Sequence, residues 1–257
     1  MNTKQDYIAV FDSGVGGISV LRHLVRILPG ERFVYFGDSA NAPYGSRSTE
    51  EVRSLTLAAV HRLLEQYPLK ALVIACNTAT AAAVNHVRAA FPELIVVGIE
   101  PALKVAADHF PGGRVGVLAT EVTLREEKFD ILLHRFDENV TMYKIPAPGL
   151  VELVEAGKVD TPETEALLRR VLQPYLGQLD AVVLGCTHYP FARAAISRVL
   201  GEKVVLLDGG EGTARETRRR LEQADLLENG AGEIIIRNSS PDPDMLRLSR
   251  ERLTQEG

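Results

Sequence analysis

The sequence predicts an α/β fold of two similar units, each a largely parallel sheet flanked by helices. Short apolar runs alternate with helix-like segments along the whole chain, which favours parallel strands joined by right-handed crossovers. The pattern also repeats. The two cysteines, Cys76 and Cys186, stand 110 residues apart, and the apolar run at 8–11 has a counterpart 107 residues later, at 115–118. Two such units would face each other across a cleft, with one cysteine from each.

The first part of the chain predicts four strands, each followed by a turn or loop and then a helix. The strands are short apolar runs rich in β-forming residues, over 7–11, 33–36, 71–75 and 95–99. The first run leads into a glycine-rich turn at 12–17 and a helix that Pro29 and Gly30 end. A loop is expected at 38–45. Further helices are expected over 49–66, from the first cysteine to about 91, and from Pro101 to a break at 111–113.

The second part of the chain continues this alternation. Strands are expected over 115–120, 140–145, 180–184, 204–208 and 233–236. Helices are expected over 123–134, 150–156, 162–176, 213–223 and 242–253.

Length and composition indicate an ordinary soluble globular protein. The chain of 257 residues is 46% hydrophobic and 25% charged, so it can bury a sizeable core. Its net charge of −5 argues against a nucleic-acid partner, and the arginines between 215 and 220 are expected on a solvated helix face. No run of about 18 apolar residues exists, so we expect no membrane association. Without a signal-peptide pattern, we expect a cytoplasmic protein with reduced thiols.

The turn at 12–17 differs from the dinucleotide-binding loop and from the P-loop. A dinucleotide loop of the pattern G-x-G-x-x-G needs a glycine where Ser19 stands, although Asp38 lies about where a ribose-binding acid would. No P-loop pattern is present. The exposed amides of such a turn, at the start of a helix, would instead suit a substrate carboxylate.

Both cysteines stand at the carboxyl end of a predicted strand. Ligands of open α/β sheets bind there, so both thiols are expected at the edge of a site rather than in a core. They could instead be structural, since free cysteine often packs as a small apolar residue. Zinc needs three or four ligands, and Cys76, Cys186 and His188 offer no close-spaced pair. A disulfide is disfavoured in a reducing compartment.

A pair of acid/base thiols is the remaining interpretation, and it suits racemisation at a carbon atom. Racemisation needs a base on one face of the carbon and an acid on the other, and a thiol with a pKa near 8.5 can serve as either. One cysteine would be thiolate while the other is thiol, with the roles exchanged for the opposite enantiomer. With each sulfur about 3–3.5 Å from the carbon, the sulfurs would lie roughly 6–7 Å apart, too far for a disulfide of about 2.05 Å.

The candidates for moving protons near the thiols are His188, Asp12 and Glu155. His188 follows Cys186 by two residues and could bond the thiol, take its proton or cap the helix. A carboxylate beside a cysteine raises the thiol pKa, so Asp12 or Glu155 would help as a proton acceptor rather than through its field. Glu152 is expected on the solvated face of the same short helix.

The reaction would also need groups that hold the substrate while a carbanion-like state forms. The backbone amides of Ser13, Asn77 and Thr78, and the hydroxyls of Thr78 and Thr187, could supply such donors. Pyridoxal phosphate would need a Schiff-base lysine, and Lys70 lies at the wrong end of its strand. We therefore expect no cofactor and no metal.

Four motifs together resemble the glutamate racemases of the cofactor-independent aspartate/glutamate racemase family. Their order and spacing match over nearly the whole chain. The motifs are Asp12-Ser13-Gly14-Val15-Gly16-Gly17, Asp38-Ser39 through Pro43-Tyr44-Gly45, Ala75-Cys76-Asn77-Thr78-Ala79 and Gly185-Cys186-Thr187-His188-Tyr189-Pro190. The resemblance implies an enzyme that interconverts L- and D-glutamate for peptidoglycan synthesis.

The resemblance also implies roles for individual residues. Cys76 would work on D-glutamate and Cys186 on L-glutamate, and Glu155 would be the assisting acid of Leu153-Val154-Glu155. The substrate would be held by Asp12, Ser13, Tyr44, Gly45, Asn77, Thr78, Thr187 and His188. The family fold has two α/β domains with a C-terminal tail returning to the first, so we place the domains at 1–98 plus 209–257 and at 99–208. The chain could also pair as a homodimer.

The sequence departs from the family pattern outside these motifs. Glu126 and Phe129 stand where a small polar residue and a tyrosine are usual, and Gly209 replaces a serine. These changes concern substrate contact, packing and regulation. Two other functions stay open: racemisation of another amino acid such as aspartate, and non-catalytic binding of an acidic amino acid or a protein partner.

Overall fold

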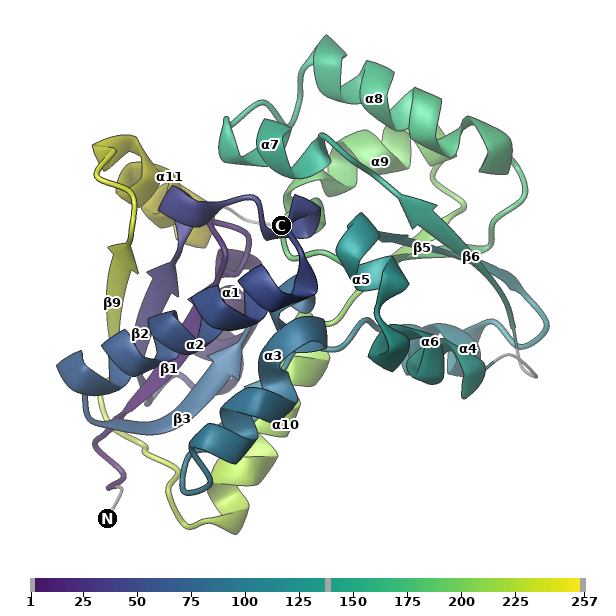
Figure 1. Cartoon of the computed structure of the whole chain (residues 1–257). Helices are drawn as coiled ribbons and strands as arrows, with labels where there is room; N and C mark the ends of the chain where they lie inside the picture. Colours follow the sequence, from purple (N-terminus) through teal and green to yellow (C-terminus); the bar gives the residue numbers. More distant parts are fainter. Residues whose placement is uncertain (1–2, 137–139, 255–257) are drawn as a thin grey trace.

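The computed structural model describes residues 3–136 and 140–254, which form two sheets with helices packed on their faces (Figure 1). The strands of the first sheet are β1 (Tyr7–Asp12), β2 (Arg32–Gly37), β3 (Leu69–Ile74), β4 (Ile95–Gly98) and β9 (Glu233–Asn238). The strands of the second are β5 (Arg114–Ala119), β6 (Thr141–Pro146), β7 (Ala181–Leu184) and β8 (Val205–Asp208).

Both sheets are parallel throughout. The first has the order β4-β3-β1-β2-β9 and the second the order β6-β5-β7-β8. Every neighbouring pair within them runs parallel. The predicted α/β fold with two largely parallel sheets is therefore confirmed.

Helices cover both faces of each sheet. Those of the first half are α1 (Ile18–Ile27), α2 (Thr49–Gln66), α3 (Asn77–Ala90), α10 (Gly210–Gln223) and α11 (Pro243–Thr254). Those of the second half are α4 (Leu103–His109), α5 (Glu121–Arg125), α6 (Glu127–His134), α7 (Leu150–Glu155), α8 (Pro162–Leu172) and α9 (Arg193–Leu200). Short 3-10 turns lie at Ser39–Asn41, Tyr44–Ser46, Gln173–Tyr175 and Tyr189–Ala192.

Alternating side chains of the strands build separate core layers on the two faces. On β1, Phe11 packs in the layer under α2 and α3, whereas Ile8 and Val10 pack in the layer under α1 and α10. The second sheet has a layer toward α7, α8 and α9 and another toward α4, α5 and α6. The strands are near-continuous apolar runs because both faces are buried.

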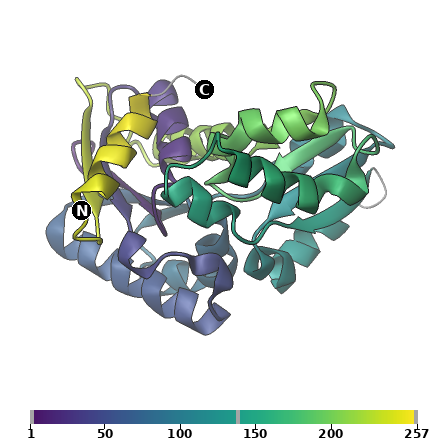
Figure 2. The same cartoon turned by 90° about the horizontal axis from the view of Figure 1, so that it is seen from above.

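The two halves lie side by side in both views (Figures 1 and 2). The chain crosses to the second sheet after β4 and returns after β8. Its C-terminal part then rejoins the first sheet, because β9 pairs with β2 and both α10 and α11 pack against α1. This arrangement is compatible with domains at 1–98 plus 209–257 and at 99–208, which stay a prediction about folding units.

One predicted helix is wrong, because residues 123–134 belong to two helices. Thr120 caps α5 by accepting a hydrogen bond from the amide of Thr123. Glu126 then has an extended backbone, with φ −69° and ψ 132°, which ends α5 and starts α6. A period of hydrophobic residues continues across this break, so the pattern alone does not show it.

Two other helix bounds differ from expectation. The helix predicted to reach 176 ends at Leu172, and Pro174 lies in the 3-10 turn that follows, since proline cannot continue the hydrogen-bond ladder. The helix predicted from 213 begins at Gly210, whose N–H donates to the Asp208 carboxylate at 3.0 Å.

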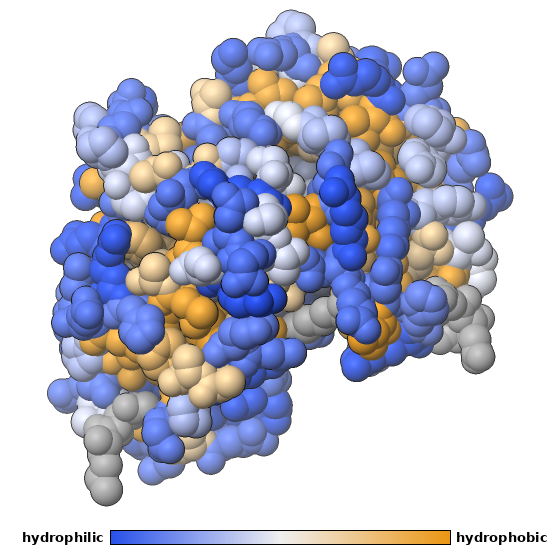
Figure 3. All heavy atoms as spheres, in the orientation of Figure 1, coloured by the Kyte–Doolittle hydropathy of each residue, from blue (hydrophilic) through white to orange (hydrophobic). Residues whose placement is uncertain are grey.

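Polar side chains cover most of the face drawn in Figure 3, with apolar residues in smaller patches between them. Arg215, Arg218 and Arg219 of α10 are exposed and pair along the helix with acids three or four residues away, so the predicted solvated face is confirmed for these three. Among the described residues, no helix is both long and apolar enough to span a membrane.

Candidate active site

The centre of the candidate site lies at the carboxyl ends of four central strands. Asp12 is the last residue of β1, and Cys76 follows β3 and caps α3. In the second sheet Thr120 follows β5, and Cys186 follows β7. Since β1 lies beside β3 and β5 beside β7, each half brings two strand ends to the same edge.

Cys76 is enclosed at the start of α3 and is 4% exposed. Its Sγ accepts the amide of Ala79 at 3.4 Å and donates to Ser13 Oγ at 3.5 Å. Burial, together with the charge of Asp12, raises the pKa of the Cys76 thiol to about 12. The charge of Cys186 acts in the same direction. Both cysteines are free thiols.

Asp12 is fully buried between the halves. Its Oδ1 accepts the Gly14 N–H at 2.9 Å, and its Oδ2 accepts the Thr187 hydroxyl at 2.9 Å. Burial raises the pKa of Asp12 above its ordinary value. The charge of His188 and the two hydrogen bonds act against this shift without cancelling it. Asp12 therefore has the properties of a proton acceptor beside the first thiol, and it joins a strand of one half to the cysteine loop of the other.

The second thiol lies beside a histidine–carboxylate pair. Cys186 is 7% exposed, and its Sγ lies 3.7 Å from His188 Nδ1. The other ring nitrogen of His188, Nε2, lies 2.6 Å from Glu155 Oε1. Burial lowers the pKa of His188, but the hydrogen bonds with Cys186 and Glu155 outweigh it, so this pKa lies well above the usual value. A chain of proton-carrying groups thus runs from the thiol to Glu155.

The glycines of the turn at 12–17 allow this chain to approach the first half. The amide of Val15 donates to Glu155 Oε1 at 2.8 Å. A Cβ on Gly14 would come within 1.9 Å of Glu155 Oε1, and one on Gly16 within 2.4 Å of His188 Nδ1. The amides expected to bind a substrate carboxylate are therefore used by carboxylates of the protein itself. Ser19, at the missing third glycine, donates to the Thr187 carbonyl at 2.9 Å.

The loop after β2 closes the first half around the site. The Tyr44 hydroxyl donates to Asp38 Oδ2 at 2.7 Å, and Tyr44 is 1% exposed. Burial and the Asp38 charge raise the pKa of Tyr44. Gly45 lies against Thr120 of the second half, where a Cβ would meet the Thr120 methyl at 2.7 Å. Asp38, which lies about where a ribose-binding acid would, thus accepts hydrogen bonds from its own loop.

Asn77 and Thr78, after the first cysteine, are both buried. Asn77 Oδ1 has no hydrogen-bond partner among the described residues. A buried acceptor without a partner is costly unless a ligand supplies the donor. The Thr78 hydroxyl lies 3.0 Å from Thr120 Oγ1 and 3.2 Å from Thr123 Oγ1.

Thr120 and Thr123 are site residues that the sequence analysis missed. Their hydroxyls lie 2.9 Å apart and join Thr78 in a buried cluster that links the halves. The internal repeat held the signal, because the offset of 107 residues that relates the first strands places Thr120 at the position of Ser13.

The structure brings all the predicted residues to the junction between the halves. Asp12, Ser13, Tyr44, Gly45, Asn77, Thr78 and Cys76 lie on the first half, and Glu155, Cys186, Thr187 and His188 on the second. Both thiols are buried rather than open at an edge, so the site is closed in this conformation. Among the described residues, no group of three or more His, Cys, Asp or Glu side chains could hold a metal ion.

Comparisons with known proteins agree with this geometry. The family model described as Asp/Glu/hydantoin racemase matches residues 8–217. A glutamate racemase of Clostridium botulinum (strain Alaska E43 / Type E3) is 44% identical over 254 residues, which cover 98% of each chain. The crystal structure of glutamate racemase isoform RacE1 from Bacillus anthracis has a TM-score of 0.89 at 33% identity and covers 98% of this chain and 96% of that one. A glutamate racemase from Francisella tularensis in complex with D-glutamate has a TM-score of 0.85 at 27% identity, over 98% and 95% of the two chains.

Proposed function

The chain belongs to the Asp/Glu/hydantoin racemase family, and we propose that Cys76 and Cys186 act as the two opposed acid/base groups of its reaction. That reaction is the interconversion of L- and D-glutamate, in keeping with relatives that match almost the whole chain. It supplies D-glutamate for peptidoglycan synthesis.

The observation that carries the proposed roles is the equivalent placement of the two thiols. Each follows a central strand of its own sheet, and each has its own proton-handling partner. Asp12 and Ser13 accompany Cys76, and His188 with Glu155 accompanies Cys186. A substrate carbon between the sulfurs would meet an acid on one face and a base on the other.

In the direction from L- to D-glutamate, the Cys186 thiolate takes the Cα proton and becomes a thiol. The electron pair of the broken C–H bond then forms a new bond to the proton of the Cys76 thiol, which becomes a thiolate. The raised pKa of Cys76 keeps it protonated at neutral pH and ready to donate. The opposite direction exchanges these roles, and His188 and Asp12 receive or return protons between turnovers.

Substrate binding would use one unsatisfied acceptor and several hydroxyl groups beside the two thiols. Asn77 Oδ1 is suited to the substrate ammonium group, because it is a buried acceptor without a partner among the described residues. The hydroxyls of Thr78 and Thr187, with Ser13 and the Tyr44–Gly45 segment, would hold the carboxylates. The hydroxyls that now bond Thr120 and Asp12 would then exchange one partner for another.

An assay of turnover with different amino acids is the simplest test of the proposal. Purified protein without added cofactor should remove the circular dichroism signal of L-glutamate and of D-glutamate, but not that of L-aspartate. Cys76→Ala and Cys186→Ala should retain D-glutamate binding in calorimetry and lose turnover. Turnover of aspartate instead would change the substrate, and unchanged turnover in either variant would refute the thiol roles. Homodimer formation and a cytoplasmic location stay predictions from the sequence.

A further inference from the structure

A groove of about 610 Å³ lies between α1 and the start of α9, outside the candidate active site. One wall is a stripe of α1, with Ser19, Arg22, His23 and Arg26 at helical spacing. The other is a stripe of the second half with the same spacing. Its members are Pro190, Arg193, Ala194 and Ser197. Asp208 closes the groove at the end of β8.

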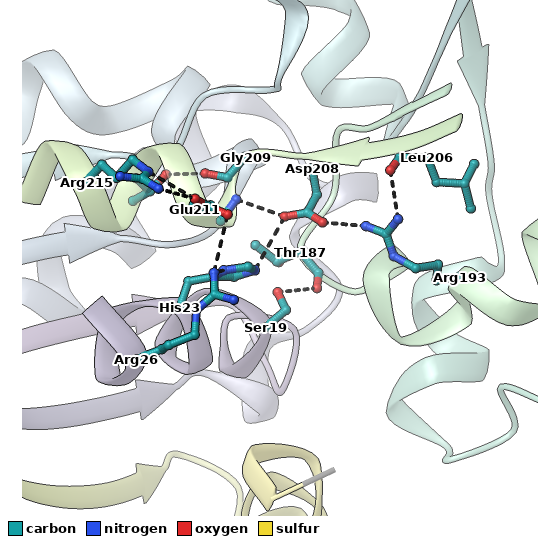
Figure 4. A network of polar contacts seen from close by, with 12 residues as sticks. Ser19, His23, Arg26, Thr187, Arg193, Leu206, Asp208, Gly209, Glu211 and Arg215 are labelled. Carbon is teal, nitrogen blue, oxygen red and sulfur yellow. Dashed lines mark hydrogen bonds and ion pairs between the residues drawn. The ribbon is translucent and has the colours of Figure 1, made fainter. Parts of the chain in front are cut away.

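The groove is positive within a protein of net charge −5. Three arginines line it against one carboxylate, Asp208. Arg193 donates hydrogen bonds to that carboxylate at 2.5 Å and to the Leu206 carbonyl at 2.8 Å (Figure 4). His23 lies 3.9 Å from Asp208, but burial lowers its pKa, so it adds little positive charge near neutral pH.

The other two arginines keep hydrogen-bonding capacity. Arg26 lies 3.3 Å from Glu211, and Figure 4 shows that this carboxylate is shared with Arg215, which approaches it at 2.6 Å. Arg22 makes no hydrogen bond or ion pair with any described residue. Planar guanidinium groups of this kind match the oxygens of a phosphate group.

The rest of the lining leaves room for more than a bare ion. Ala194 and the serines on both walls are small, and Pro190 and the His23 ring offer apolar surface. The Ser19 hydroxyl is held by the Thr187 carbonyl, which ties the two walls together (Figure 4). The volume lies in the range of pockets that hold organic ligands.

We propose that this groove binds a phosphate ester, with the phosphate on Arg22 and Arg26 and the organic part against Pro190 and Ala194. The ligand chemistry is a phosphate group, and its source is a small organic phosphate rather than free inorganic phosphate. The proposal does not depend on the roles of the two thiols.

The test is isothermal titration calorimetry of the full chain at 150 mM NaCl with two probes, phenyl phosphate and inorganic phosphate. Phenyl phosphate should bind about tenfold more tightly than inorganic phosphate, because only it can use the apolar wall. Arg22→Gln should weaken both by about tenfold, and Arg22→Gln with Arg26→Gln should abolish measurable binding. Arg170→Gln, which removes an exposed arginine of α8 outside the groove, should bind like the unaltered protein.

Thermal unfolding of each variant checks that the fold is kept, as expected because neither Arg22 nor Arg26 is buried. Absence of binding by the unaltered protein would overturn the proposal, and so would equal affinity in Arg22→Gln with Arg26→Gln. Equal weakening in Arg170→Gln would show a general charge effect and would also overturn it. Equal affinity for the two probes would overturn the assignment to an ester.

Discussion

At the residue scale, the two thiols have different surroundings. Cys76 lies beside the buried carboxylate of Asp12, and Cys186 beside His188, whose pKa is raised. The first environment favours a neutral thiol, and the second offers the sulfur a proton carrier. The two thiols therefore differ in the groups beside them, which suits the proposed reaction with one acid and one base.

Asp12→Asn tests the electrostatic link between Asp12 and Cys76. The Asp12 charge raises the pKa of the Cys76 thiol, so an uncharged amide should lower this pKa from about 12, while burial keeps it above its ordinary value. Thiolate absorbance near 240 nm should then rise at a lower pH than in the unaltered protein. Racemisation should fall by roughly 10²- to 10⁴-fold, the range for loss of a general acid/base group.

Glu152→Gln is the matched control, because it removes a carboxylate that is exposed on α7. It should leave both the thiol titration and the rate unchanged. A Cys76 pKa that stays the same in Asp12→Asn would contradict the proposed link.

The sequence pointed to charged, nucleophilic and several neutral candidates for the site, but it did not point to two threonines. Asp12 and His188 were found because they flank strand ends and carry titratable groups. Thr120 and Thr123 were missed because a threonine hydroxyl has many structural uses, and only the folded chain shows that theirs meet Thr78 across the halves.

At the element scale, the glycine-rich turn after β1 is a surface for close approach. Its glycines were expected to expose backbone amides for a ligand. The structure shows Glu155 and His188 in the space that side chains at Gly14 and Gly16 would fill. This close approach depends on Glu155, which lies 140 positions from Val15 and accepts the hydrogen bond of its amide. A local sequence pattern therefore cannot predict it.

Gly14→Ala should separate Glu155 from the turn. Its Cβ would lie 1.9 Å from Glu155 Oε1, so the carboxylate must move and His188 loses its partner. A displacement of about 1 Å in a catalytic group lowers kcat/KM by about 10²-fold. Steady-state kinetics of both enantiomers measure the effect.

Gly212→Ala provides the matched control. A Cβ there meets nothing within 4 Å, and Gly212 lies in α10. This variant should be about 0.5–1 kcal/mol more stable to denaturant and fully active. Normal kinetics in Gly14→Ala would show that the close approach is not needed for turnover.

The break between α5 and α6 is another feature of this scale. Glu126 starts α6 and its Oε1 lies 2.5 Å from the Thr49 hydroxyl at the start of α2. From the sequence, Glu126 was recognised only as a departure from the family pattern. The contact between Glu126 and Thr49 joins the halves. It could not be predicted from the sequence, because it depends on how the starts of α2 and α6 lie relative to each other.

At the scale of the whole molecule, the site is enclosed by contacts between its halves. Asp12 bonds Thr187, Val15 bonds Glu155, and the threonine cluster joins α3 to α5. With the thiols only 4% and 7% exposed, we expect glutamate to enter through a separation of the halves. The internal repeat predicted the two sheets, because local apolar runs determine strands, but how closely the sheets meet depends on contacts that are distant in sequence.

Thiol labelling should detect this opening. A thiol reagent should modify Cys76 and Cys186 slowly, at a rate set by opening, and saturating D-glutamate should slow it further by stabilising the closed form. Absorbance of the released chromophore measures both rates. Rapid modification that glutamate does not affect would contradict a closed resting conformation.

The most direct test of the two-thiol account is racemisation of pure L-glutamate in deuterium oxide, followed by proton NMR and circular dichroism. Opposed bases predict that deuterium enters the D-glutamate product while the remaining L-glutamate keeps its Cα proton at early times. Because the enantiomers have equal free energy, Cys76→Ser and Cys186→Ser should each lower kcat/KM equally in both directions. Product that retains the original proton, or a single-cysteine variant that still racemises at the normal rate, would contradict the account.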